Sequence, residues 1–463
     1  MTSTFFGLDL ALRALHAQQT GLDVTNHNVA NANTKGFSRQ RVNIVATTPF
    51  SEPGLNRAGG PGQIGTGSIA DSIERFRDTF LDLQYRTEVG AGAQAQVTRD
   101  ALEQIEVVLN EPSDTGIANL LQEFYQSWQD LTNDPTEGAN RSAVVQQATA
   151  LAAAFNRASQ RMSAIQLDLN GQVAIGVQEI NSIVGQIDAL NRQIVQVEVT
   201  GQNANDHRDR RDALLDELSQ KVPITAVENA NGSINVSING HNLVSPGNVD
   251  SLITTPTGPG GMLQIRFGSD SVLTSVTTGE LKGLIDTRDI NLPSYVAQLN
   301  TVAANMITAV NALHTTGYGL DNVTGRAFFT GTDAATIAVN AVIVADPQRV
   351  AAAAAANQPG DSSIALAIAQ LRTTMTPSSE SSYAALITTL GVDTRSTQDK
   401  ATNQDALVQL LERRREDVSG ISLDEEATNM VRFQRAYEAA ARLMTAFDQM
   451  LDTLINRTGI VGR

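Results

Sequence analysis

Five histidines are the side chains of this 463-residue chain best suited to acid–base or metal chemistry: His16, His27, His207, His241 and His314. They are dispersed, and no two have the His-Glu-x-x-His spacing that places a pair of imidazoles on one helix face for zinc. Because the chain has no cysteine, thiol nucleophiles, disulfides and thiolate metal ligands are excluded. Neither a Walker A sequence nor a nucleophile elbow occurs. We predict that the protein is not an enzyme and that it binds no cofactor and no metal.

One polar cluster, residues 206–209, combines groups that could ligate a metal, with the sequence Asp-His-Arg-Asp. Its charges alternate in sign, and an amphipathic segment follows through Leu214, Leu215 and Leu218. This pattern favours a solvated, salt-bridged start of a helix over a metal site.

The overall composition restricts the kinds of partner. The net charge is −16, so the chain repels phosphate backbones and we expect no nucleic-acid partner. No apolar run reaches membrane-spanning length, and we expect no membrane insertion. The start of the chain lacks a basic segment, and Asp9 and Arg13 interrupt its apolar residues, so we expect no cleaved secretion signal. The length predicts two to four domains.

Both ends of the chain carry apolar stripes at the 3-4 spacing of helices that pack on other helices. An ordinary intramolecular core would give the same stripes. Without a partner such a helix is only marginally stable, so we expect both ends to be poorly ordered in a free monomer and ordered on assembly. The N-terminal stripe comprises Phe5, Leu8, Leu12, Leu15, Leu22 and Val29, and the C-terminal stripe Leu423, Ala427, Met430, Tyr437, Ala441, Met444, Leu451 and Ile455.

Between these ends the periodicity predicts an α+β chain of several domains. A helix and an extended loop segment occupy 1–70, and long helices occupy 71–222, with a possible break at Gly171 and Gly176. Strict alternation at 233–240 after an Asn-Gly turn predicts a β-rich domain at 223–290. A helix with a mixed segment follows at 291–396, and helices at 397–463. The last helix has capping-box spacing from Ser422 to Glu425.

The turn after the first helix carries the most specific sequence motif. Residues 28–37 read Asn-Val-Ala-Asn-Ala-Asn-Thr-Lys-Gly-Phe, which resembles the N-terminal signature of the axial proteins of the bacterial flagellum. The following Ser38-Arg39-Gln40 is similar to the hook-associated protein 1 family in particular. Stretches at 204–218, 279–289 and 419–442 also resemble that family. The same turn also fits a solvated helix end whose asparagines form local hydrogen bonds.

The resemblance implies a structural subunit rather than a catalyst. Its terminal helices would pair into a long α-helical coiled-coil inner domain, with the β-rich segment as an outer domain. Members form the junction ring between hook and filament and leave the cell through the flagellar type III apparatus without a cleaved signal peptide. The implied location is therefore extracellular. The implied partners are further copies of the chain, the hook protein, a second junction protein or filament protein, and a cytoplasmic export chaperone at the C-terminal segment.

The resemblance and the stripes together give the residues expected to make assembly contacts. The N-terminal set is Leu8, Leu12, Leu15, Leu22, Asn28, Asn31, Asn33, Thr34 and Gly36; the C-terminal set, shared with the chaperone, is Leu423, Met430, Tyr437, Met444, Phe447, Leu451 and Ile455. Two alternatives remain open. A flagellar hook or rod subunit shares the Asn-rich turn, and a secreted adhesin-like protein would bind its target through the domain at 223–290.

Overall fold

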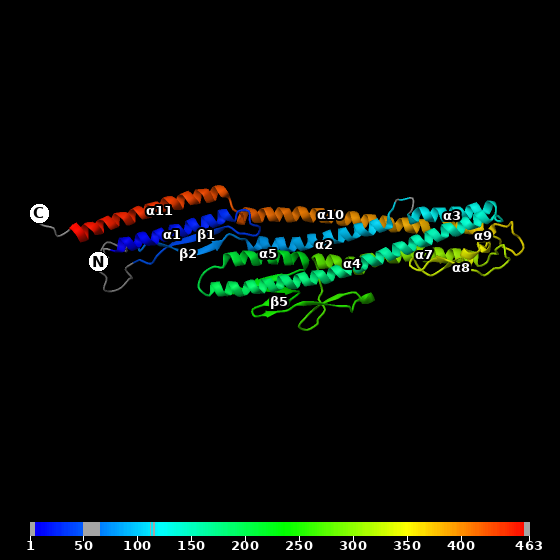
Figure 1. The fold of residues 1–463 in the computed structure, drawn as a ribbon, viewed down its shortest axis with the longest axis horizontal. Helices are drawn as coiled ribbons and strands as arrows, with labels where there is room; N and C mark the ends of the chain where they lie inside the picture. The colour runs from blue at the N-terminus through cyan, green and yellow to red at the C-terminus, as the bar shows by residue number, and fades with distance from the viewer. Residues whose placement is uncertain (1–4, 50–64, 112, 114–115, 458–463) are drawn as a thin grey trace.

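The computed structural model describes residues 5–49, 65–111, 113 and 116–457, so much of the loop expected before residue 70 lies outside the described residues. The molecule is elongated and mostly helical, with its long helices running along its length (Figure 1). None of the helices described combines the length and the apolar character needed to cross a membrane. The helices are α1 (Phe6–Ala30), α2 (Thr79–Leu109), α3 (Ile117–Asn133), α4 (Gly138–Glu198), α5 (Asn205–Lys221), α6 (Glu280–Asp286), α7 (Leu292–His314), α8 (Ala341–Ala345), α9 (Ser363–Thr374), α10 (Ser379–Ser419) and α11 (Leu423–Asp452).

Helix α4 is the longest element, with 61 residues and a length of about 90 Å. The break expected at Gly171 and Gly176 is wrong, because the helix runs through both positions. A glycine costs only about 1 kcal/mol in a helix interior, which packing readily outweighs. Gly176 also has a packing role, since a Cβ there would lie 2.8 Å from Leu281 of α6.

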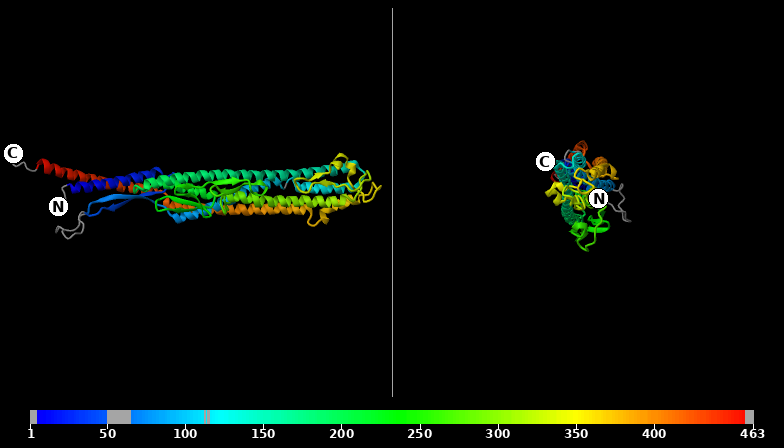
Figure 2. Two further views of the ribbon diagram at one scale, coloured as in Figure 1. Left: turned by 90° about the horizontal axis from the view of Figure 1, so that it is seen from below. Right: turned by 90° about the vertical axis from the view of Figure 1, so that its right-hand side faces the viewer.

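The expected strands lie along the flank of α4 (Figures 1 and 2). Strands β3 (Thr225–Glu228), β4 (Ile234–Ile238), β5 (His241–Ser245) and β6 (Asn248–Val249) form one antiparallel sheet in that order. Strands β7 (Leu252–Thr255) and β8 (Gln264–Phe267) form a second pair. Alternate residues of β4 are buried in one core with side chains of α4 and α5, which explains the strict alternation of the sequence there.

Three of the expected domain boundaries fall inside continuous secondary-structure elements. The boundary at 70/71 falls inside strand β2 (Ser68–Arg75), and the boundary at 290/291 falls in a π turn (Thr287–Asn291) that joins α6 to α7. The boundary at 396/397 falls inside α10, whose polar middle resembles a linker in sequence. Helix α10 continues there because it packs along α2, as shown by the hydrogen bond of 3.0 Å from Gln404 to the carbonyl of Glu88.

Helix α7 ends at a buried histidine, His314, whose protonation should change the free energy of unfolding. His314 is 1% exposed; its Nδ1 lies 2.8 Å from the carbonyl oxygen of Arg326, and its Nε2 accepts a hydrogen bond from the amide of Ala351 at 2.9 Å. Burial lowers the pKa of His314 to about 4. The folded state therefore favours the neutral imidazole, whereas the unfolded chain takes up a proton near pH 6.5.

Above about pH 6.5 we expect His314 to add no pH dependence to the free energy of unfolding. As the pH drops from about 6.5 to about 4, we expect this free energy to fall by up to about 3 kcal/mol. The chain's single tryptophan, Trp128, has its ring centroid 6.2 Å from that of His314, so its fluorescence reports unfolding of this end. Urea titrations at several pH values measure the effect, with His314→Asn as the comparison. If the variant keeps the full pH dependence, another group is responsible.

Candidate assembly site at the terminal helices

The two ends of the chain meet as an antiparallel helix pair, α1 with α11 (Figure 1). A Cβ on Gly21 would lie 2.7 Å from the ring of Phe433, and Gly7 stands in the same relation to the ring of Phe447. The two glycines and the two phenylalanines are each 14 residues apart, which is two helical repeats of seven. Each of these glycines therefore leaves a space on the surface of α1 that a phenylalanine of α11 fills. We call each such space a glycine socket.

A β-hairpin covers a second side of α1. Strands β1 (Gln40–Ala46) and β2 pair antiparallel, and Val42 of β1 packs with Val24 of α1 and with Phe433. Helix α1 is thus held by α11 on one side and by the hairpin on another, whereas the described residues leave a third side without such cover.

A buried polar cluster closes the base of the helix pair. The amide of Asn28 donates to the carbonyl of Gln40 at 2.8 Å and to Glu426 at 3.1 Å, and the backbone amide of Gln40 donates to the Asn28 side chain at 3.0 Å. Arg39 donates to Glu426 at 2.8 Å and pairs with Glu425 at 2.6 Å. Glu426 is 2% exposed, and its hydrogen bonds with Asn28 and Arg39 compensate for the burial of the carboxylate. We call Asn28, Arg39 and Glu426 the terminal clamp.

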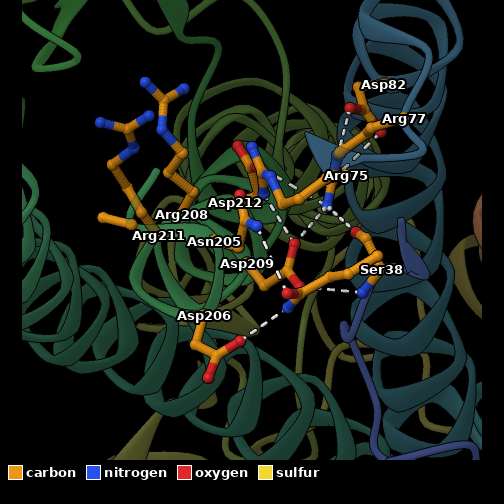
Figure 3. Close-up of polar contacts among 12 residues, drawn as sticks. Ser38, Arg75, Arg77, Asp82, Asn205, Asp206, Arg208, Asp209, Arg211 and Asp212 are labelled. Atoms are coloured by element: carbon orange, nitrogen blue, oxygen red, sulfur yellow. Dashed lines mark hydrogen bonds and ion pairs between the residues drawn. The ribbon is translucent and has the colours of Figure 1, made fainter. Parts of the chain in front are cut away.

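Ser38 and Arg75 connect the paired terminal helices to the body of the molecule (Figure 3). The amide of Ser38 donates to Asp209 of α5 at 2.9 Å. Arg75 of β2 lies between Asp209, at 2.6 Å, and Asp212, at 3.0 Å. The amide of Arg39 also donates to the carbonyl of Ser419 at 2.9 Å, which fixes the end of α10.

Further arginines extend this network into the long helices. Arg77 forms a two-point contact with Asp82 of α2, at 2.6 and 3.2 Å, and Arg415 of α10 reaches the same carboxylate at 3.0 Å. Burial tends to raise the pKa of Asp212, but Arg77, Arg75 and Arg86 outweigh it and the net shift is downward. We call Arg75, Arg77, Asp82, Asp209 and Asp212 the joint network (Figure 3).

The cluster at 206–209 is salt-bridged as expected, but the prediction that it is solvated is wrong in part. Asp209 is 5% exposed, because strand β2 and the segment after the Asn-rich turn fold over it. Asp206 stays exposed and accepts from Gln40 at 2.8 Å. Among the described residues, no group of three or more His, Asp or Glu side chains is arranged to hold a metal.

The leucine stripe of α1 does not form the contact with α11. Leu8, Leu15 and Leu22 each follow a small residue of the seam, at positions 7, 14 and 21, and are therefore rotated by about 100° from it. The small residues face α11 instead, because a glycine lets the phenylalanine ring approach the backbone. In the stripe of α1, Leu8, Leu15 and Leu22 are half-buried, whereas Phe5, Leu12 and Val29 are exposed.

On α11, the expected residues divide between the seam and its flank. Phe447 fills the socket at Gly7, whereas Leu423 and Ile455 are exposed. Met430, Tyr437 and Met444 are half-buried, three positions before the seam residues at 433, 440 and 447. Three positions before the seam correspond to a rotation of about 60° in the same sense as the rotation of the leucines. In an antiparallel pair, rotations in the same sense point to the same side, so the leucine stripe and these three residues form one apolar surface. We call it the two-helix face, made of Leu8, Leu12, Leu15, Leu22, Val29, Met430, Tyr437 and Met444.

The Asn-rich turn has two parts with different roles. Asn28 is 1% exposed and belongs to the terminal clamp, so this residue is not part of a solvated helix end. Asn31 and Thr34 make local hydrogen bonds, to the carbonyl of His27 at 3.0 Å and to the side chain of Asn31 at 3.2 Å respectively. Asn33 is exposed, and Gly36 has φ of 81°, a value that favours glycine. This exposed part fits the solvated alternative.

Sequence reasoning missed the glycine sockets, Glu426 and the joint network. The 14-residue spacing of Gly7 with Gly21 and of Phe433 with Phe447 was a usable signal for the sockets. No local signal marks the joint network, because its members come from separate parts of the chain.

Replacing a helical glycine with alanine tests the sockets, because the atoms around the glycine decide whether the added methyl group stabilises or destabilises the protein. We expect Gly21→Ala to destabilise the α1–α11 pair by about 1–3 kcal/mol, because the added methyl would press on the buried ring of Phe433. The matched control is Gly185→Ala in α4, where no atom lies within 4 Å; there we expect a gain of up to about 1 kcal/mol. Amide exchange in α11 measures the first effect and thermal unfolding the second. Unchanged exchange in Gly21→Ala would contradict a tight socket.

Known protein families match three regions of the chain. The family described as "Flagellar hook-associated protein FlgK helical domain" matches residues 102–329. The family "Flagella basal body rod protein" matches residues 8–37, and "Flagellar basal body rod FlgEFG protein C-terminal" matches residues 417–457. The last two ranges contain most of α1 and all of α11, so the two matching ends are the segments that pair in the fold.

Individual relatives agree with these matches. Flagellar hook-associated protein 1 of Salmonella typhimurium is 27% identical over 69% of this chain and 58% of that protein. The structure of the flagellar hook junction protein FlgK from Burkholderia pseudomallei is similar with a TM-score of 0.64, over 73% of this chain and all of that chain, at 17% identity, which shows a shared fold. Flagellar hook-associated protein 1 of Bacillus subtilis (strain 168) is 34% identical over the full length of both chains. These relatives are structural proteins rather than enzymes, and this chain belongs to the flagellar hook-associated protein 1 family, with a structural role in the bacterial flagellum.

Proposed function

We propose that this protein forms the junction ring between the hook and the filament and polymerises through its terminal helices. The observation that carries the proposal is the two-helix face, an apolar surface that extends along both α1 and α11 with only partial cover. A surface of this kind on a soluble chain marks an interaction site. In the proposed ring, α1 and α11 act as a coiled-coil inner domain, and the β-rich segment points outward.

The proposal includes how the subunit reaches its place and what it contacts. The chain leaves the cell through the flagellar type III apparatus without a cleaved signal peptide, and a cytoplasmic chaperone covers its C-terminal segment before export. Outside the cell its partners are copies of itself, the hook protein, and a second junction protein or filament protein. Helix α11 supports the chaperone step, because both of its phenylalanines pack on α1 in the fold and lose this contact when α1 is not paired with it.

Hook or rod subunits are the nearest alternative, since rod families match both ends of the chain. The match of residues 102–329 to the hook-associated helical domain favours the junction role. No observation favours the adhesin-like alternative.

Deleting the gene in its source bacterium tests the proposal directly. We expect cells with hooks, without filaments, and with filament protein in the medium. Loss of the hooks themselves would assign the protein to the rod or hook, and normal filaments would refute the junction role.

A charge on the two-helix face should separate assembly from folding. We expect Met444→Asp to abolish filament formation while the thermal unfolding of the α4 body changes little, because a carboxylate buried in a subunit contact costs several kcal/mol. The matched control is Ile175→Asp, an exposed apolar position of α4. Complementation of the deletion strain and thermal unfolding give the two readouts. Normal filaments with Met444→Asp would show that this face makes no subunit contact.

A further inference from the structure

Helix α11 carries a second surface that the described part of the chain leaves uncovered, on the flank opposite the two-helix face. It combines exposed apolar side chains, including Leu443 (51% exposed) and Met450 (53% exposed), with every arginine of the helix. We call it the outer face of α11, made of Arg432, Arg435, Ala439, Arg442, Leu443, Ala446 and Met450.

The two faces of this end differ in charge. Helix α11 has three arginines, and all of them lie on its outer face; Arg442 has a weak contact of 3.7 Å with Glu438, and Arg432 stacks over the ring of Phe433. The single arginine of α1, Arg13, is paired with Asp9 at 3.0 Å and lies on the side of the hairpin rather than of the leucine stripe.

The two-helix face is bordered by carboxylates instead. By helical position, Asp448 lies beside Met444, and Asp23 follows Leu22 at the edge of the α1 stripe. Both carboxylates are exposed. The two faces are therefore apolar in the middle and opposite in charge at their edges, which is the pattern of surfaces that fit each other.

Resting on the proposed ring function, we propose that the two-helix face of one copy packs on the outer face of α11 of the next copy. The occupant of each face is a second copy of this chain. The two faces lie on opposite flanks of α11, so the contact is head-to-tail. A contact of this kind leaves one face free at each end of an open oligomer, so it propagates until it closes into a ring or continues as a helix, whereas a face that binds itself stops at a dimer.

Cysteine cross-linking in assembled flagella tests this arrangement, because the chain has no cysteine of its own. One cysteine is placed in the two-helix face, at Leu8, Leu15 or Leu22, and one in the outer face, at Leu443 or Met450. The six double variants replace the native chain in cells, and hook–filament structures are isolated, oxidised and analysed on non-reducing gels. Val342→Cys combined with Leu443→Cys is the control, since Val342 is 43% exposed and belongs to α8, at the opposite end of the molecule from α11 (Figure 1).

We expect at least one double variant to give a ladder of multimers. The matching single variants should stay monomeric when expressed alone and give one dimer band when co-expressed. Dimers from a single two-helix-face cysteine would overturn the proposal in favour of self-pairing of that face. Absence of cross-links in all six assembled variants would also overturn it. These outcomes are separate from the failure of the ring function, which would appear as normal filaments in the deletion strain.

A charge exchange provides a second test that does not depend on cysteine geometry. Arg435→Glu with Arg442→Glu should reduce filament number at least tenfold, and adding Asp23→Arg with Asp448→Arg should restore it in part. Because these four positions are exposed, the variants are expected to fold. A loss of assembly that the second pair of changes worsens would refute the head-to-tail contact.

Discussion

Replacing Glu426 with alanine is expected to release α11 from α1 while the body of the molecule stays folded. Glu426 is 2% exposed and is shared by Asn28 and Arg39. Its removal leaves both donors at the base of the pair short of an acceptor. Breaking a buried charged pair from one side costs about 3–5 kcal/mol. Because Arg39 keeps its ion pair with Glu425, we expect a loss of about 3 kcal/mol, at the lower end of this range.

Amide hydrogen exchange along α11 is the measurement, and about 3 kcal/mol corresponds to roughly a hundredfold faster exchange. The neighbouring Glu425→Ala is a matched control, since it removes a partner of the same arginine from a side chain that is 60% exposed. An exposed pair contributes about 0–1 kcal/mol, so this variant should change exchange by less than about fivefold. Equal effects of the two changes would show that burial of Glu426 adds nothing to the clamp.

The terminal helices show which contacts the spacing of apolar residues can predict and which it cannot. The seven-residue repeat correctly indicates that α1 packs on another helix, but the leucine positions that it selects are not the ones that contact α11. The seam of α1 consists of residues such as Gly7 and Gly21, which carry no hydrophobic signal and contribute by leaving space. A pattern based on hydrophobicity cannot identify contacts made through a missing side chain.

The strands and the long helix illustrate the two kinds of local signal. The alternation at 233–240 predicts β4 because one side of that strand is buried and the other is not. The glycines of α4 suggest a break that does not exist, because tertiary packing outweighs a propensity difference of about 1 kcal/mol.

The joint network lies beyond any local signal. Its charges come from β2, from the start of α2 and from α5, separated by more than a hundred residues. An arginine followed by aspartates reads as a solvated surface when the segment is taken alone. Only the fold shows that these charges are buried together. A buried charge without a partner costs several kcal/mol, so removing any one member destabilises the others.

Asp212→Asn should therefore weaken the attachment of the hairpin and α5 to the long helices. Asp212 lies within 3.0 Å of Arg75, 3.5 Å of Arg77 and 3.4 Å of Arg86. The amide has the same size but no charge, so three enclosed cations lose one of their carboxylates. We expect a loss of about 3–5 kcal/mol, seen as faster amide exchange in β1, β2 and α5. The control is Asp206→Asn, whose side chain is 56% exposed and should cost less than about 1 kcal/mol.

A double change separates lost charge balance from lost packing. If Asp212→Asn acts by leaving a cation unpaired, adding Arg86→Met should recover part of the stability, because the excess positive charge is removed and the aliphatic stem is kept. Purely additive losses would mean that each side chain acts through packing alone. Recovery would show that charge balance in the joint network helps to hold the hairpin and α5 on the long helices.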